Sequence, residues 1–550
     1  MLAPANELLS RLRTIDVAER IGPSDAPWHG ALLAEWAASD VRFAASTPAL
    51  EAQYYRALRE LFGAIRPAAT PEPVLNEGGV YHGCWLESTG SISAELTSRF
   101  LPALAVRTFG AFVTHQRPDG LFPYKVTESG PGFAQIQIVT PFARCVWNAY
   151  RIGAVSRVAL AGFYEAMARN DAWLAAHRDT RGTGAVEAFC TYDTGHDSSA
   201  RFWHMPDSPA GNDPARYDAA NPFLPLVAPD LTANVACQRR YLALIAGELG
   251  HDPAPWRERA AASEAALFAQ CYDETDACFY DRDRHGRLLR VQSDVLLRVL
   301  ACEIGDDAFF DEALRRYLLN TRKFFARFPF TSLALDDPRF DPDFDHNSWS
   351  GPTNLLSLIR APHAFEAHHR HVELSWVLQP ILAAQFRAER FAQTLNPWTG
   401  AAGFTETYSP STLCLIDFVE RLCGILPRPD GTLWFTGLVP LQLEHRDVAH
   451  ETAYARRVDG RAFELVNTRA GVSAWRDGRP LFAAPHGVRV VTSREGRVLS
   501  LIGMSAAGTA GTLEIGDLRL DLRIAPNEQL DLVEGRLVSV RDPGLILPTT

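Results

Sequence analysis

Two stretches, far apart in the chain, place carboxylates among aromatic residues. In the first, Asp193 and Asp197 lie four residues apart and Arg201 follows, while the second, residues 403–410, carries Glu406. No long apolar run covers either stretch, so we interpret both as loops. Two acids on separate loops could share the work of cleaving a glycosidic bond, in which one protonates the leaving oxygen and the other activates water. The alternative for each acid is structural, as a helix cap or as the partner of an arginine.

The composition limits the classes of protein to which the chain can belong. Its 550 residues carry a formal net charge of −11, with 47% hydrophobic and 22% charged residues, as in an ordinary globular protein. Nucleic-acid binding needs clustered Lys and Arg, so the acidic balance argues against it. No apolar run of about 18 residues occurs, so we expect no membrane partner. The sequence does not indicate an oligomeric state.

The cysteines and the missing motifs bear on location and cofactors. The nine cysteines are odd in number, scattered and without a CxxC pair, which predicts reduced, buried thiols. The N-terminus lacks a basic flank followed by an apolar segment, so we expect a cytoplasmic protein. No phosphate loop, dinucleotide fingerprint or complete metal-ligand pattern is present, so we predict no cofactor and no metal.

Two kinds of periodicity divide the chain. Apolar residues recur at three- and four-residue spacing over about residues 50–440, with long aromatic loops between the predicted helices. After about Val439, short β-type runs alternate with glycine and proline turns, which is typical of a small sandwich. We therefore predict an N-terminal helical extension (1–49), a double ring of helices around a central pocket (50–440) and a β-sandwich-like domain (445–550). Predicted helices include 47–66, 93–113, 231–249, 256–271, 353–363, 368–387 and 410–426.

Six stretches in order carry a family resemblance. They are residues 81–88, 115–123, 135–141, 192–202, 348–352 and 406–412, the first of them the loosest. Gly195, Asp197 and Arg201 keep the glycine, second acid and arginine of one family segment, and Glu406 begins a second segment, Glu-x-Tyr-x-Pro. The chain resembles the (α/α)6-barrel glycosidases related to glycoside hydrolase family 63, which include mannosylglycerate hydrolases and, more distantly, trehalases. That resemblance implies a mainly α fold, an (α/α)6 toroid, with a small C-terminal all-β domain.

The resemblance also implies roles for individual residues. Asp197 matches the general acid and Glu406 the general base of an inverting reaction. The chain departs from the family where Asp193 replaces a glutamate, Ser350 an arginine and Leu413 a glycine. Loss of the arginine bears on recognition of an acidic aglycone. From the motifs and from aromatic residues suited to sugar rings, the predicted substrate-binding residues are Trp85, Glu87, Gln116, Gln137, Tyr192, Asp193, Arg201, Trp349, Tyr408 and Trp434.

These features predict an exo-acting, inverting glycoside hydrolase that cleaves a short α-linked glucoside or mannoside, with a small carbohydrate as its binding partner. Two alternatives remain open. Helical barrels also host sugar epimerases and polysaccharide lyases, which use histidines, and His196 lies inside the first acidic stretch. The drift at Asp193, Ser350 and Leu413 would equally suit a carbohydrate-binding protein that has lost activity.

Overall fold

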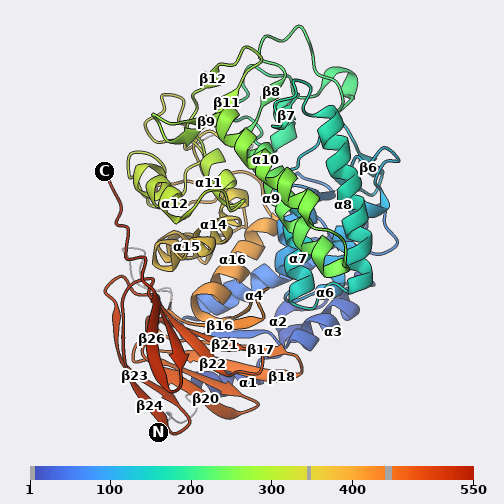
Figure 1. Cartoon of the computed structure of the whole chain (residues 1–550). Helices are drawn as coiled ribbons and strands as arrows, with labels where there is room; N and C mark the ends of the chain where they lie inside the picture. The colour runs from blue at the N-terminus through green and yellow to red at the C-terminus, as the bar shows by residue number, and fades with distance from the viewer. Residues whose placement is uncertain (1–6, 344–348, 440–448) are drawn as a thin grey trace.

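The computed structural model describes residues 7–343, 349–439 and 449–550. A helical region with long loops occupies about the first three quarters of the chain, and an antiparallel β region follows it. Figure 1 shows the two stacked, with the small strands β7, β8, β11 and β12 at the end of the helical region far from the β region. All strand ladders in the described chain are antiparallel.

The long helices follow the predicted apolar periodicity closely. α9 (Pro229–Leu249) and α10 (Ala254–Cys271) are joined by a short turn at Gly250 and pack against each other. α16 (Ser409–Cys423) is buried along its whole length and packs on α4 (Pro48–Gly63). The remaining helices are α1 Glu7–Thr14, α2 Val17–Ile21, α3 His29–Ser39, α5 Ala94–Thr97, α6 Pro102–Thr114, α7 Phe142–Arg151, α8 Arg157–His177, α11 Val295–Leu300, α12 Asp307–Ala313, α13 Leu355–Leu358, α14 Ala361–Ala367 and α15 His371–Gln385.

Prolines divide two of the predicted helices. The 93–113 prediction becomes α5 and α6, because Pro102 opens α6 and holds Leu101 in a non-helical conformation. The 353–363 prediction likewise becomes α13 and α14, with Pro362 in the first turn of α14. Within the described ranges, none of the helices combines the length and the apolar character that crossing a lipid bilayer requires.

Two sheets form the β region, and aromatic side chains pack between them. Phe435 of one sheet lies 5.8 Å from Phe463 and 5.4 Å from Phe482 of the other, measured between ring centroids. The first sheet has the order β1 (Arg42–Ala45), β17 (Thr452–Val458), β18 (Arg461–Asn467), β19 (Val472–Arg476), β20 (Arg479–Ala484), β23 (Thr509–Ile515) and β24 (Leu518–Ile524). The second has the order β15 (Ile425–Pro427), β16 (Thr432–Gly437), β21 (Val488–Ser493), β22 (Val498–Gly503), β25 (Gln529–Val533) and β26 (Arg536–Arg541).

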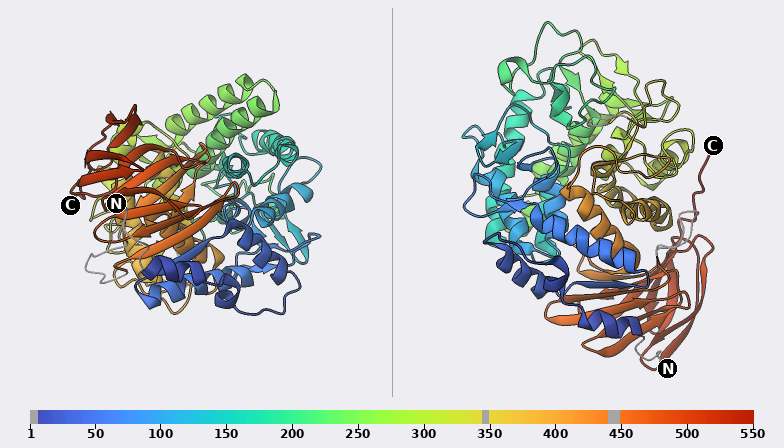
Figure 2. Two further views of the ribbon diagram at one scale, coloured as in Figure 1. Left: turned by 90° about the horizontal axis from the view of Figure 1, so that it is seen from below. Right: turned by 180° about the vertical axis from the view of Figure 1, so that it is seen from behind.

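The β region takes in strands that precede the expected start at residue 445. β1 comes from the N-terminal extension, and β15 and β16 directly follow α16. The expected boundary itself, residues 440–445, lies outside the described residues. Figure 2 shows α4 (blue) and α16 (orange) where the helical region meets the sheets. Glu420 of α16, fully buried there, pairs with Arg456 of β17 and with Arg99.

Short strands organise the loops of the helical region. β4 (Cys84–Trp85), β5 (Lys125–Thr127) and β6 (Gly130–Gly132) form one small sheet, and β7 (Glu187–Ala188), β8 (Leu226–Val227), β11 (Asp281–Arg282) and β12 (Leu288–Leu289) form another. The first acidic stretch follows β7 directly. The other short strands are β2 Ile65–Arg66, β3 Val74–Leu75, β9 Tyr272–Asp273, β10 Cys278–Phe279, β13 Thr353–Asn354 and β14 Thr394–Leu395.

Candidate active site

Asp197 lies on a tight loop whose backbone conformation requires a glycine at position 195. The chain leaves a short 3-10 turn, Thr191–Thr194, through Gly195 in the left-handed conformation (φ 64°). A Cβ at Gly195 would overlap the carboxylate of Glu87. Ser198, directly after Asp197, also has a positive φ of 59°, which is uncommon for a residue other than glycine. The loop therefore holds Asp197, which is half-buried, in a tightly constrained conformation.

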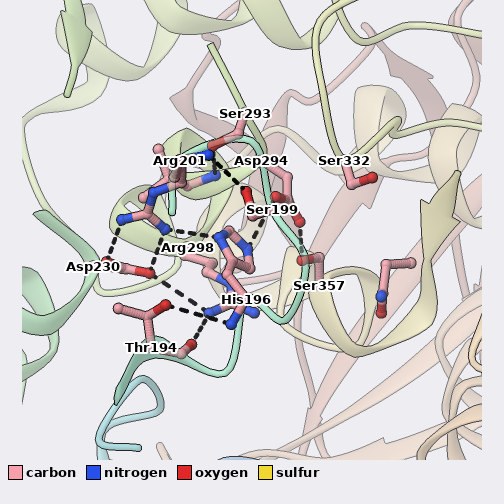
Figure 3. A network of polar contacts seen from close by, with 12 residues as sticks. Thr194, His196, Ser199, Arg201, Asp230, Ser293, Asp294, Arg298, Ser332 and Ser357 are labelled. Carbon is pink, nitrogen blue, oxygen red and sulfur yellow. Dashed lines mark hydrogen bonds and ion pairs between the residues drawn. The ribbon is translucent and has the colours of Figure 1, made fainter. Parts of the chain in front are cut away.

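Arg201 anchors this loop through buried contacts with Asp230 and His196 (Figure 3). Its Nε and Nη2 donate to Asp281 at 2.8 and 2.7 Å, its Nη1 and Nη2 donate to Asp230 at 3.0 and 2.9 Å, and Nη1 also donates to His196 Nδ1 at 2.7 Å. A guanidinium has five N–H donors, and these contacts use all five. Arg201 is buried and fully engaged in the scaffold, and its contact with substrate stays a prediction.

The two aspartates that share Arg201 differ in their electrostatics. Burial acts to raise the pKa of both carboxyls. At Asp230, attraction to Arg201 and to Arg298 outweighs burial and holds the pKa well below its usual range. At Asp281, burial outweighs attraction, and the pKa lies above the usual value. The buried network around Arg201 therefore contains at least one carboxylate, that of Asp230, which is charged at neutral pH.

His196, in the same loop, is buried and neutral. Burial lowers its pKa well below the usual value, and the nearby Arg298 and Arg201 lower it further. Nδ1 accepts from Arg201, so the proton resides on Nε2, which faces Asp294 Oδ1 at 3.1 Å. The ring packs on Trp349 at 4.5 Å between centroids. Such an imidazole is a scaffold element rather than an available base.

Glu87 and Asp193 hold the loop from two further directions. Glu87 is buried between Arg298 and Arg360, at 3.2 and 3.3 Å. Asp193 is fully buried, pairs with Arg178 at 2.6 Å and accepts backbone N–H groups of the neighbouring loops. These contacts give Asp193 a structural role inside the loop, and its contact with substrate stays a prediction, whereas Glu87 lies directly against the Asp197 turn.

Glu406 lies at the surface of a cavity of about 940 Å³. Its neighbours Thr405 and Thr407 have positive φ values of 58° and 54°. For β-branched residues this conformation is strained, and such strain gathers at functional sites. The turn at Gly78 and Gly79 packs so closely on this loop that a Cβ at Gly79 would lie 2.7 Å from the carbonyl oxygen of Glu406.

Tyr81 connects the two acidic loops. Together with Glu406 it lines the cavity. Burial raises the pKa of Tyr81 well above its usual value, and the charge of Asp197 raises it further. Its hydroxyl donates to Gln393 at 3.1 Å, and its ring lies 6.0 Å from that of Tyr408. That the Asp197 and Glu406 carboxyls face each other across one pocket stays a prediction, which the position of Tyr81 supports.

An aromatic surface carrying one cation lies beside Tyr81. The Trp85 ring lies 5.8 Å from Tyr81 and 5.6 Å from Tyr124. Lys125, paired with Trp85 across β4 and β5, places its Nζ 4.7 Å from the Trp85 ring centroid. It is one of two lysines in the chain, and burial lowers its pKa. No carboxylate in the described part of the chain pairs with it.

Four other predicted substrate contacts lie in this part of the fold. Gln137 is buried with a positive φ of 41°, and its Oε1 has no hydrogen-bond partner among the described residues. Tyr192 is half-buried, and the Asp197 charge raises its pKa after the larger effect of burial. Trp349 and Tyr408 are completely covered, so neither ring offers a free face to a sugar. Of the 348–352 stretch, residue 348 lies outside the described residues.

Gln116 and Trp434 make structural contacts and do not line the Glu406 cavity, so their contacts with substrate stay predictions. The Gln116 amide donates to two backbone carbonyls and accepts from Arg169, so it fixes its loop onto α8. Trp434 belongs to β16 in the β region, where its ring lies between Arg428 and Arg489, 4.0 and 4.3 Å away. Gln116 thus holds a loop against α8, and Trp434 packs within the β region.

Sequence reasoning missed Tyr81, Arg298, Arg360 and the buried acid Glu77. Tyr81 opens the loosest of the six stretches, so only that motif could have indicated it. Arg298 occurs inside an apolar helical run, Val295–Leu300, and an arginine on a buried face needs a buried partner. No spacing links Arg360 or Glu77 to the acidic stretches. Their proximity arises only from the fold.

Comparisons with known proteins agree with this geometry. The sequence profile of the mannosylglycerate hydrolase MGH1-like glycoside hydrolase domain matches residues 81–411, more than half of the chain. Fold, acidic loops and profile together define a glycoside hydrolase. The chain belongs to the MGH1-like glycoside hydrolase family. A comparison with curated proteins gives no match.

Solved structures share the fold at low sequence identity. The GH63 mannosylglycerate hydrolase from Thermus thermophilus, in complex with Tris and D-glycerate, has a TM-score of 0.55 and 18% identity, covering 66% of this chain and 99% of that one. A sialidase reaches 0.58 at 13% identity over 84% and 42% of the two chains. A GH78 rhamnosidase of Bacillus sp. GL1 reaches 0.51 at 10% identity over 78% and 40%. At these identities the likeness concerns the fold alone.

Proposed function

We propose that this glycoside hydrolase is an exo-acting, inverting enzyme for a short α-linked glucoside or mannoside, with Asp197 as general acid and Glu406 as general base. The observation that supports the proposal is that both acids lie on loops with positive φ values, while Tyr81 lines the cavity of Glu406 and its pKa responds to the charge of Asp197. We further infer that the helices form an (α/α)6 toroid. The antiparallel α9–α10 pair and the likeness to the GH63 fold support it.

The proposed reaction is a single displacement. Asp197 gives its proton to the glycosidic oxygen as the bond from that oxygen to the anomeric carbon breaks, and the aglycone leaves as an alcohol. A water attacks the opposite face of the sugar while Glu406 takes one of its protons. Inverting enzymes hold the two carboxyls roughly 6.5–9.5 Å apart to leave room for that water. The exposure of Glu406 to its cavity suits a group that must reach water.

The surroundings support a sugar ring with a small acidic aglycone. Gln137 Oε1 and Trp85 Nε1 are buried polar atoms with no partner among the described residues, and such groups normally take a hydrogen bond. Lys125, over the Trp85 ring, offers an ammonium to a carboxylate. A structure of the Thermus relative contains D-glycerate and another contains glucose. Lys125 would then supply the positive charge of the family arginine that Ser350 replaces.

A cytoplasmic location is part of the proposal. All nine cysteines are buried and free, as expected of a protein made in a reducing compartment. The epimerase or lyase alternative has less support, because His196 is fully buried and its Nδ1 accepts from Arg201.

The proposal is tested by sugar release from a panel of α- and β-linked glucosides and mannosides, with and without a carboxylate on the aglycone. Proton NMR of the first product should show the β-anomer from an α-linked substrate. Retention of configuration would exclude inversion by this pair. Binding without release would favour the alternative of a carbohydrate-binding protein.

A further inference from the structure

Glu77 is a buried acid that joins three segments around the Glu406 loop. It follows β3 and is 4% exposed. Its Oε1 accepts from the hydroxyl of Tyr408 at 2.6 Å, and its Oε2 accepts from the hydroxyl of Ser88 at 2.5 Å. Its backbone N–H donates to Gly83, and its carbonyl accepts from the N–H of Ser409, the first residue of α16.

Through these contacts Glu77 clamps the Glu406 loop from both sides. On one side it holds Tyr408, two residues after Glu406. On the other side it leads into Gly78 and Gly79, whose backbone lies directly on residues 405–407. The Val80 N–H donates to Thr405 Oγ1 at 3.2 Å, which adds a third point of attachment.

A strained loop keeps its conformation only if its surroundings determine it. Thr405 and Thr407 both have positive φ values, and the elements that touch this segment on either side meet at Glu77. We propose, as a consequence of the function proposed above, that Glu77 is a positioning residue that holds Glu406 in its catalytic orientation through Tyr408 and the Gly78–Gly79 turn.

The protonation state of Glu77 would control this clamp. As a carboxylate, Glu77 accepts both hydroxyl hydrogen bonds, whereas the protonated acid must donate its own proton, so one of the two bonds reverses or breaks. Burial raises the pKa of Glu77 to about 7, while the Ser88 and Tyr408 hydroxyls act to lower it. The titratable or charged groups around Glu77 are Tyr81, Cys84, Glu87, Arg360 and Tyr408.

The test compares the wild type with Glu77→Gln, Tyr408→Phe and the double variant, assayed for kcat and KM from pH 5.5 to 8.5. We expect kcat to fall about tenfold in each single variant, which corresponds to about 1.4 kcal/mol in the barrier, with KM changed less than about threefold. Because both changes break one link, the double variant should lose little more than either alone. The acid limb of the wild-type profile near pH 7 should be absent in Glu77→Gln.

Glu95→Gln is the matched control, since Glu95 of α5 is also buried and hydrogen-bonded, to Asn148 at 2.9 Å, but does not touch the Glu406 loop. It should keep the wild-type kcat and pH profile even if the thermal midpoint falls. Wild-type kcat and an unchanged acid limb in Glu77→Gln would overturn the proposal. So would equal losses in Glu77→Gln and Glu95→Gln, because those would reflect general destabilisation.

Hydrogen exchange separates this proposal from the proposed function. Backbone amides of residues 404–411 should exchange faster in Glu77→Gln than in the wild type at pH 8, and no such change should occur in Glu95→Gln. Unchanged exchange would refute the clamp whatever the activity. Faster exchange, with Glu406→Gln as active as the wild type, would leave the clamp in place and refute the assignment of Glu406 as base.

Discussion

Replacing Arg201 by methionine should lower the free energy of unfolding, because it disrupts the buried network of Arg201, Asp230, Asp281 and His196. The substitution keeps an apolar stem of similar length but removes all five hydrogen bonds to Asp230, Asp281 and His196. Breaking a buried pair by removing one partner costs about 3–5 kcal/mol, because the remaining charge stays buried. This is a large part of the total of about 5–15 kcal/mol that stabilises a typical protein.

The contribution of this network to stability should depend on pH in opposite directions in the wild type and in Arg201→Met. In the wild type, the pKa of Asp230 is lowered by Arg201, so its contribution is present above about pH 4 and is lost as the pH falls. Burial already raises the pKa of Asp281, and without Arg201 that pKa should rise further. A raised carboxyl pKa contributes stability at low pH that is lost as the pH rises. The difference in the free energy of unfolding between the wild type and Arg201→Met should therefore shrink as the pH falls from 7 to 5.

Urea unfolding at pH 5 and pH 7, followed by tryptophan fluorescence, measures both effects. Arg316→Met is the matched control, because Arg316 forms a solvent-exposed pair with Glu312 and such pairs contribute about 0–1 kcal/mol. A loss below about 1 kcal/mol in Arg201→Met, or a loss that is the same at both pH values, would refute the role assigned to this network.

Two further substitutions test the loop and the aglycone contact. In Gly195→Ala, the alanine must adopt a positive φ, which costs an L-residue roughly 1–2 kcal/mol, and its Cβ must displace the Glu87 carboxylate. We therefore expect kcat to fall by more than about tenfold. Wild-type activity would show that the close approach of Gly195 to Glu87 is not needed. Lys125→Met should raise KM roughly 10–100-fold for a substrate with a carboxylate on its aglycone, since a hydrogen bond to a charged group contributes about 1.5–3 kcal/mol, and should leave KM for the matching neutral glycoside unchanged. An equal change for both substrates would mean that Lys125 only supports the Trp85 ring.

The sequence predicts best where structure is local. The α9 and α10 helices match their predicted ranges to within two residues because long apolar periodicity and short turns define them. The predicted helix 93–113 fails at Pro102, where a single residue outweighs the surrounding periodicity. β1 was not predicted at all, because it is a strand only through pairing with β17, about 400 positions later in the chain.

The same limit applies to the candidate site. Motifs indicated the loops of Asp197 and Glu406, but not which of their side chains point inward. Arg201 was expected at the substrate, yet its partners Asp230 and Asp281 come from the first turn of α9 and from β11, which no spacing connects to it. Glu77 has no motif, and its importance follows only from the contact with Tyr408, 331 positions away.

The central claim is that Asp197 gives a proton to the leaving oxygen and Glu406 takes one from water. Its most direct test measures kcat/KM of Asp197→Asn and Glu406→Gln on two glycosides of one sugar, with an alkyl and an activated aryl aglycone.

On the alkyl glycoside, both variants should lose about 10²–10⁴-fold, the usual contribution of general acid–base catalysis. On the aryl glycoside, Asp197→Asn should recover much of its rate, because an acidic phenol leaves without protonation, whereas Glu406→Gln should stay slow. Recovery in Glu406→Gln but not in Asp197→Asn would reverse the two roles, and near wild-type rates in both variants would place the chemistry elsewhere.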